Sequence, residues 1–196
     1  MLPPSLKNLI NHFSRLPGIG QRAATRLSFY LLSRPAEELE SFAQTLKDLK
    51  TKTKVCPNCF NLTSDNLCAI CADKKRDANL ICVIEDILDI IPIERTRQFN
   101  GLYHVLGGLI SPTDGLTPDK LKIKELINRI KRAKTPPEII LAFNPTIEGD
   151  ATALYLERIL KPFNIKITRL ARGLSTGNDL EYADESTLIN AIKFRK

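Results

Sequence analysis

The sequence predicts an α/β protein in three parts: an N-terminal helical hairpin module, a small cysteine knuckle, and a parallel α/β sheet domain with a C-terminal extension. Apolar residues recur at helical spacing through residues 6–49. Further along, all-apolar runs such as 80–84 alternate with helical segments, which is typical of parallel strands covered by helices on both faces. Between these regions, residues 55–72 hold four closely spaced cysteines and show neither a helical nor a strand period.

The N-terminal region is expected to form two short helices around a tight turn within residues 4–32, followed by a third helix. Pro17-Gly-Ile-Gly20 separates the first two, because proline stops a helix and glycine permits positive φ. The helical spacing rests on Leu6, Leu9, Ile10, Phe13 and Leu16 in the first helix and on Leu39, Phe42, Leu46 and Leu49 in the third. The second helix, from Gln21 to Leu32, is expected to bury Ala23, Ala24, Leu27, Tyr30 and Leu31.

The sheet domain is expected to alternate strands with helices. The predicted strands are 80–84, 138–143 and 165–170, and the predicted helices are 87–97, 119–133 and 151–160.

Composition narrows the class of protein. The chain has 196 residues, of which 43% are hydrophobic and 26% charged, as in soluble globular proteins. It has no run near the roughly 20 apolar residues of a membrane span and no signal-peptide stretch at its start. We therefore expect a cytoplasmic protein that does not enter a membrane. The formal net charge of +7 indicates a polyanion as a candidate partner, although charge alone does not identify one.

Four of the five cysteines form two Cys-x-x-Cys pairs, Cys56 with Cys59 and Cys68 with Cys71, separated by eight residues. Each short turn points two thiolates inward, and four thiolates fill the tetrahedral shell of Zn²⁺ without leaving a position for substrate. The spacing therefore predicts one structural zinc ion. An iron–sulfur cluster, a redox pair and four free thiols are the alternatives. Cys82 stands apart in an apolar run and is expected to be a small buried residue.

The turn between the first two helices resembles the helix-hairpin-helix motif that binds DNA. Gly18 and Gly20 would let the backbone approach a phosphate, and the N–H groups that start the second helix would face the anion. Arg22 and Arg26, one helical turn apart, would add positive charge to the same site. Such contacts carry no base information, so we expect DNA binding that is independent of sequence. The alternative is an ordinary turn between two helices, or a contact with protein.

The order of motifs along the whole chain resembles the RecR family of recombination mediators. The glycine hairpin and the cysteine knuckle are followed by four family-like segments, 81–85, 97–108, 144–149 and 180–185. Each motif alone occurs elsewhere, but their collinear combination is quite specific.

This resemblance implies a division of the chain and a set of partners. Residues 1–53 would be the helix-hairpin-helix DNA-binding region, 54–77 the four-cysteine zinc finger, 78–172 a Toprim domain, and 173–196 a C-terminal segment. By the same resemblance, the protein would act in DNA repair in the bacterial nucleoid. With RecO and RecF it would help load RecA at single-strand gaps. The family forms dimers that can close into tetrameric rings around DNA.

Toprim enzymes hold Mg²⁺ with a glutamate after the first strand and an Asp-x-Asp pair after a later strand, and Glu85 matches the first position. Asn144 and Thr146 stand where the two aspartates would lie, and neutral side chains do not offset the charge of the ion. We therefore predict that the protein is not an enzyme and assign no catalytic residue. A Mg²⁺-dependent DNA-processing enzyme and a zinc-stabilised protein adaptor without direct DNA contact are the two alternatives.

Glu85, Asn144, Glu148 and Asp150 are expected to gather at the strand ends, where open α/β sheets present their sites. A surface that binds a protein partner is the preferred interpretation, with residual metal binding second. Solvent-exposed acidic residues that complement a helix dipole would give the same pattern.

The remaining polar and aromatic candidates are given structural rather than catalytic roles. Tyr103, Tyr155 and Tyr182 are expected to pack, and His12 and His104 to be surface or packing residues. The polar loop 173–179 has Asn178 where the family usually has a second glycine, and it lacks the signature of a phosphate-binding loop.

Overall fold

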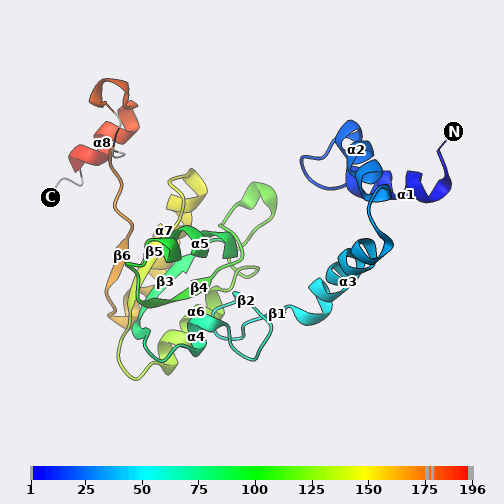
Figure 1. Ribbon diagram of the computed structural model, residues 1–196. Coiled ribbons are helices and arrows are strands. Elements are labelled where there is room, and N and C mark those ends of the chain that lie inside the picture. The colour runs from blue at the N-terminus through cyan, green and yellow to red at the C-terminus, as the bar shows by residue number, and fades with distance from the viewer. Residues whose placement is uncertain (1, 175–176, 178, 194–196) are drawn as a thin grey trace. The chain divides into compact units, whose positions relative to one another are not determined.

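The computed structural model describes residues 2–174, 177 and 179–193 (Figure 1). The chain divides into two compact units, Met1–Thr53 and Lys54–Lys196. None of the described helices is long and apolar enough to cross a membrane.

The first unit is helical. Pro4 lies in the first turn of α1, where its missing N–H costs nothing, and Gly18, with φ of +77°, allows the turn before α2. The bounds are α1 Pro4–Ser14, α2 Gln21–Leu32 and α3 Ala36–Lys52. All three predicted helices are therefore present.

The core of this unit is small. It consists of Leu6, Ile10 and Ala24, with two partly buried neighbours. The predicted inner face of α2 is largely wrong, because Ala24 is buried but Ala23 is exposed and Leu27 and Tyr30 are 39% and 50% exposed. When two short helices pack together, each buries only a narrow stripe of the other's surface, and the remaining apolar side chains stay exposed. None of the described residues of α3 is buried either.

The second unit begins with the cysteine knuckle. Its elements are β1 Lys54–Val55 and β2 Leu62–Thr63, paired antiparallel, and the one-turn helix α4 Ala69–Ala72. The sequence showed no period here because two-residue strands are too short to display one.

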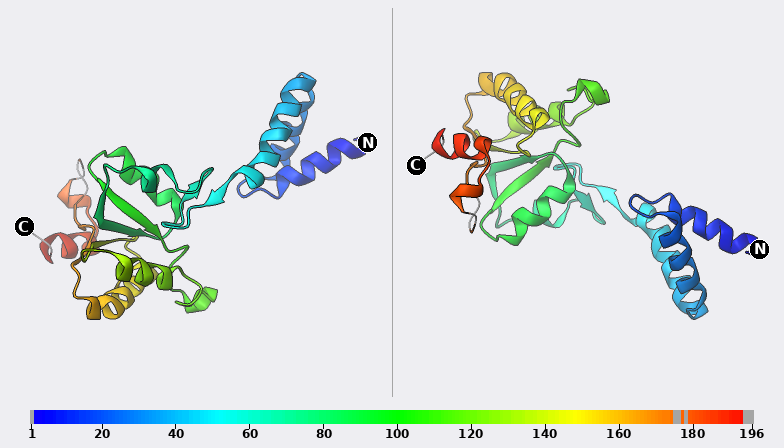
Figure 2. Two further views of the ribbon diagram at one scale, coloured as in Figure 1. Left: turned by 90° about the horizontal axis from the view of Figure 1, so that it is seen from below. Right: turned by 90° about the horizontal axis from the view of Figure 1, so that it is seen from above.

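A four-stranded parallel sheet forms the body of the second unit, in the order β4-β3-β5-β6. Its strands are β3 Asp77–Ile84, β4 Gly101–Val105, β5 Glu138–Ala142 and β6 Ile167–Arg169. The helices are η1 Ile87–Asp89, α5 Ile90–Arg95, η2 Pro112–Asp114, α6 Ile123–Arg132, α7 Ile147–Leu160, η3 Lys161–Phe163, η4 Leu180–Tyr182 and α8 Glu185–Lys193. Figure 2 shows α5 on one face of the sheet and α6 and α7 on the other.

Alternate residues of β3 supply two separate cores. Ile81 and Val83 pack with α6 and α7 on one face, while Cys82 and Ile84 pack with α5 on the other. Each of these four side chains is at most 2% exposed. A strand buried on both faces is an uninterrupted apolar run, which is why the sequence revealed it. Cys82 is buried, as predicted.

Strand β4 is the one strand of the four-stranded sheet that the sequence did not predict. Tyr103 and His104 interrupt its apolar run, yet both are fully buried. The Tyr103 hydroxyl donates to Glu94 over 2.7 Å, and His104 Nε2 lies 2.8 Å from the carbonyl oxygen of Lys122. Burial lowers the pKa of His104 to about 4, so its ring is neutral and packs as an uncharged group.

The predicted strands and helices of the sheet domain lie where expected, with shifted ends. Helix α7 begins at Ile147 rather than at residue 151, because the Thr146 side chain accepts a hydrogen bond from the Gly149 N–H and caps the helix. Helix α6 is shorter than the predicted 119–133.

Candidate functional site

The four knuckle cysteines converge. Their Sγ atoms all lie within 4.8 Å of one another. Tetrahedral coordination at about 2.3 Å from zinc separates the sulfur atoms by about 3.8 Å, so this arrangement fits the ion. The backbone N–H of Cys68 donates to Cys56 Sγ over 3.5 Å, and that of Cys71 donates to Cys68 Sγ over 3.4 Å. Such N–H donors stabilise thiolates, the form that binds metal.

Two of the thiols also share a proton, which a bound metal ion would displace. The hydrogen bond between Cys59 and Cys71 lowers the pKa of Cys71 to about 5 and raises that of Cys59. The side-chain amide of Asn58 donates to Cys71 Sγ over 3.5 Å and favours the same thiolate. A group of thiols poised between protonated and charged forms is a suitable donor set for Zn²⁺.

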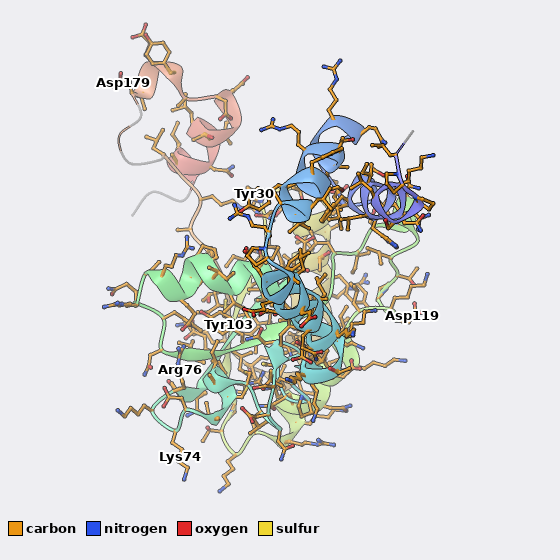
Figure 3. The ribbon with its side chains drawn as sticks, turned by 45° about the vertical axis from the view of Figure 1, so that its right-hand side comes forward. Tyr30, Lys74, Arg76, Tyr103, Asp119 and Asp179 are labelled. Carbon is orange, nitrogen blue, oxygen red and sulfur yellow. The ribbon has the colours of Figure 1, made fainter. Side chains whose placement is uncertain are left out.

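The knuckle is fastened to the sheet by backbone and side-chain contacts. The Val105 N–H of β4 donates to the carbonyl oxygen of Cys59 over 2.9 Å. Just after the knuckle, Arg76 donates to Glu94 of α5 over 2.9 Å, and Glu94 also accepts from Tyr103 of β4. The Arg76 bond lowers the pKa of Glu94 below its ordinary value. Figure 3 labels Arg76 and Tyr103 in this part of the second unit. The metal site is thus held rigidly against β4.

The hairpin residues lie where the sequence placed them, at the turn and the start of α2. Gly18 has φ of +77°, so glycine is needed there for the turn. Gly20 has an ordinary φ of −79°, and apart from its neighbours in the chain no described residue lies within 4 Å of the position that a Cβ would take. No side chain caps α2, so its first N–H groups are not covered by a cap. Arg22 and Arg26 are both exposed.

Glu85 and Asn144 come together at the ends of neighbouring strands. Glu85 follows β3 and Asn144 follows β5, and the Asn144 side chain lies close enough to affect the Glu85 carboxyl group. Burial raises the pKa of Glu85, and the nearby Asp89 carboxylate adds to this rise, against the opposing effect of Asn144. The carboxylate is therefore less ready to carry charge than an exposed one.

Asp150 pairs with arginines and lines the same pocket as Asn144. It accepts hydrogen bonds from Arg172 over 2.6 and 3.0 Å and from Arg169 over 3.2 Å. Glu148 lies beside it in the first turn of α7. Among the described residues, the four cysteines form the one group of metal-binding side chains that converge. Of the four predicted acidic-site residues, Glu85 and Asn144 thus lie at neighbouring strand ends, Asp150 is paired with arginines, and Glu148 is exposed in the first turn of α7.

Sequence reasoning missed the two arginines that pair with Asp150. Arg169 ends β6 and Arg172 follows it. They reach Asp150 because β6 lies beside β5, a neighbour relation that no local pattern shows.

The other predicted roles have mixed outcomes. His12 is exposed and His104 is buried, in line with surface and packing roles. Tyr103 and Tyr155 pack against the two cores. Tyr182 is 81% exposed, so the prediction that it packs is wrong within this chain. Asn178, in the polar loop, lies outside the described residues.

Four family models match consecutive parts of the chain. They are the RecR helix-hairpin-helix at residues 6–50, the RecR four-cysteine zinc finger domain at 53–73, the Toprim domain at 79–171 and the RecR C-terminal model at 173–196. With the convergence of the four thiols, the second match shows that the chain has one structural zinc site. The parallel sheet with helices on both faces agrees with the Toprim match.

Curated relatives are similar over nearly their full length. Recombination protein RecR of Cutibacterium acnes is 52% identical over 190 residues, which cover 97% of this chain and 94% of the relative. The protein of the same name from Synechococcus elongatus is 48% identical over 191 residues, covering 97% and 95%. That from Staphylococcus aureus is 48% identical over 193 residues, covering 98% and 97%.

Proposed function

The chain belongs to the RecR family of recombination proteins, as its motifs predicted, and from this premise we propose that it is a non-enzymatic DNA-binding protein of recombinational repair. The observation that carries this proposal is the hairpin of the first unit. The uncapped start of α2 offers N–H donors to a phosphate group, and the open backbone at Gly20 allows the phosphate to approach. Two exposed arginines add positive charge beside it.

Charge in the first unit supports a polyanionic ligand. Residues 1–53 contain eight lysines and arginines against four aspartates and glutamates. Lys50 and Lys52 close α3, and Arg22 and Arg26 lie near the start of α2. Since phosphate contacts contribute most of non-specific binding, this unit is the part of the chain expected to hold DNA.

Replacing both Arg22 and Arg26 by alanine is expected to weaken DNA binding about tenfold at every sequence tested. The slope of log K against log salt should become shallower by about 2, because each phosphate contact releases about one counterion. Fluorescence anisotropy across a salt titration measures both quantities. The control is Lys124→Ala with Lys131→Ala, which removes the same charge from exposed positions of α6. Equal affinity and slope in a folded R22A/R26A protein would exclude the hairpin as the DNA contact.

Gly20 offers a separate test of the hairpin. Threonine is about as good as glycine at the start of a helix, so Gly20→Thr should change the free energy of unfolding by less than about 0.5 kcal/mol. The added side chain would hold a phosphate away from the backbone, and DNA affinity should fall severalfold. Gly18→Ala is the contrasting variant: it should cost about 1 kcal/mol of stability, because alanine is strained at φ of +77°. Undiminished DNA affinity of G20T would show that no phosphate approaches Gly20.

The lack of enzymatic activity is supported by the strand ends of the sheet. Asn144 and Thr146 are neutral, the Thr146 side chain caps α7, and Asp150 is bound by two arginines. A cluster organised in this way provides few carboxylate oxygens for Mg²⁺. The anisotropy samples should therefore contain intact DNA after incubation with Mg²⁺. Nicked or relaxed DNA that depends on Mg²⁺ would favour the Toprim enzyme instead.

RecO and RecF are the proposed partners, by resemblance, in helping to load RecA at single-strand gaps. The surface proposed to receive a partner lies around Glu85 and Glu148. Two strongly exposed apolar side chains stand at the same strand ends: Leu88 after β3, 70% exposed, and Ile147 after β5, 85% exposed. Exposed apolar side chains beside acidic ones are typical of a protein-binding surface.

A dimer or a tetrameric ring is the proposed assembly. The first unit leaves Leu27, Phe29 and Tyr30 of α2 and Phe42 and Leu46 of α3 at least 39% exposed. This much uncovered apolar surface on one small helical unit supports burial against a second copy. A ring would hold sequence-independent contacts on DNA without requiring high affinity at any one of them.

We propose one role for each of the predicted segments of the chain. Residues 1–53 hold DNA, 54–77 form the zinc finger, 78–172 bind partners and 173–196 form a C-terminal segment. The proposed location is the cytoplasm, at the bacterial nucleoid.

A further inference from the structure

Arg129 is an arginine of α6 whose charged end is buried between the knuckle and the sheet. Its Nη1 donates to the carbonyl oxygen of Tyr103 in β4 over 2.6 Å and lies 3.4 Å from the carbonyl oxygen of Asn58 in the knuckle. Its Nη2 is buried and has no hydrogen-bond partner among the described residues. A guanidinium removed from water needs a compensating negative charge, because isolated buried charges are strongly unfavourable.

That negative charge is supplied by the knuckle. Burial lowers the pKa of Arg129, and the negative charge of the knuckle cysteines, that of Cys71 most, opposes this effect. Four thiolates around Zn²⁺ carry a net charge of about −2. A buried cation next to such a site lowers the electrostatic cost of holding four thiolates together.

Asn58 connects the two groups directly. Its carbonyl oxygen faces Arg129, and its side-chain amide donates to Cys71 Sγ over 3.5 Å. Arg129 therefore contacts the Cys56–Cys59 turn and, through Tyr103, the strand to which that turn is fastened.

We propose that Arg129 is a positioning residue of the zinc site, whose guanidinium offsets the charge of the four thiolates and fixes the knuckle against β4. The sheet domain thereby contributes a charge to a metal site whose ligands all come from the knuckle. Zinc affinity then depends on α6 as well as on the four cysteines.

The test is the zinc affinity of the full chain, measured by competition with a chromogenic chelator. Arg129→Gln should weaken zinc binding about 10- to 100-fold, the usual effect of losing an outer partner of a metal site. Arg129→Lys keeps the positive charge but loses the planar guanidinium group with its several N–H donors. Its zinc affinity should lie between that of R129Q and that of the unchanged protein. The thiolate-to-cobalt absorption band of the Co²⁺-loaded protein reports whether all four sulfurs still bind.

Glu94→Gln is the matched control, because it weakens another polar contact close to the knuckle, that of Glu94 in α5 with Arg76, without removing a cation beside the thiolates. It should leave zinc affinity within about threefold of the unchanged protein, against the 10- to 100-fold loss expected for R129Q. Zinc binding that is equally weak in E94Q and R129Q would mean that general loosening, and not charge, is responsible. Unchanged zinc affinity in R129Q would overturn the proposal outright.

If R129Q does not fold, the unchanged protein still decides the question. A buried pair is screened little by salt, so zinc affinity should change less than about threefold between 0.1 and 1 M salt. A loss of about tenfold or more over that range would assign the compensating charge to exposed lysines and overturn the role of Arg129.

Discussion

Serine at both Cys56 and Cys59 is expected to abolish zinc binding and unfold the knuckle. The hydrophobic cluster of this segment consists largely of the cysteines themselves, and its two strands are two residues long. Structural zinc contributes an apparent binding free energy of about 10–16 kcal/mol, which nothing else in so small a segment can replace. Zinc content per chain should fall from about one to near zero. Limited proteolysis should then cut within residues 54–73, while the sheet resists.

Cys82→Ala provides the control for this experiment. Cys82 is a cysteine of β3, 2% exposed, whose thiol lies outside the converging group. Its replacement should leave zinc content unchanged and cost only about 1 kcal/mol of stability. Full zinc content in the C56S/C59S protein, or the same loss of zinc in C82A, would contradict the assignment of ligands.

Leu156→Ala should destabilise the second unit by about 2–5 kcal/mol. Leu156 is fully buried in the core that α7 forms with β3 and β5, so truncation removes apolar contacts and leaves a cavity. Urea denaturation of the zinc-loaded chain, followed by circular dichroism, measures the change. Leu154→Ala is the matched control, because Leu154 lies on the same helix and is 61% exposed. It should cost less than about 0.5 kcal/mol. Equal losses in the two variants would mean that α7 is not packed as described.

The sequence was most informative where one local pattern determines the structure. Strands β3 and β5 were predicted because strands buried on both faces are continuous apolar runs. The converging thiols were predicted because two Cys-x-x-Cys turns point their sulfur atoms inward. The helices of the first unit followed from helical spacing, and the families of the hairpin and of the knuckle followed from the order of their motifs.

It was least informative where the outcome depends on what packs against a residue. Strand β4 was missed because Tyr103 and His104 are buried against Glu94 and Lys122, which belong to other parts of the fold, 9 and 18 residues away along the chain. Burial on α2 was overestimated, since periodicity shows an apolar face but not whether anything in the same unit covers it. The pairing of Asp150 with two arginines required the order of the strands.

The bond between the Val105 N–H and the Cys59 carbonyl oxygen has a consequence for solubility. β4 is one of the two edge strands of the sheet, and its open side would otherwise present unpaired backbone groups to other molecules. Strands exposed in this way are templates for intermolecular pairing and aggregation, which natural proteins prevent by covering them. The knuckle provides that cover, and zinc keeps the knuckle folded. Removal of the metal would therefore leave the sheet folded but expose the edge of β4. We expect the metal-free protein to aggregate through that edge.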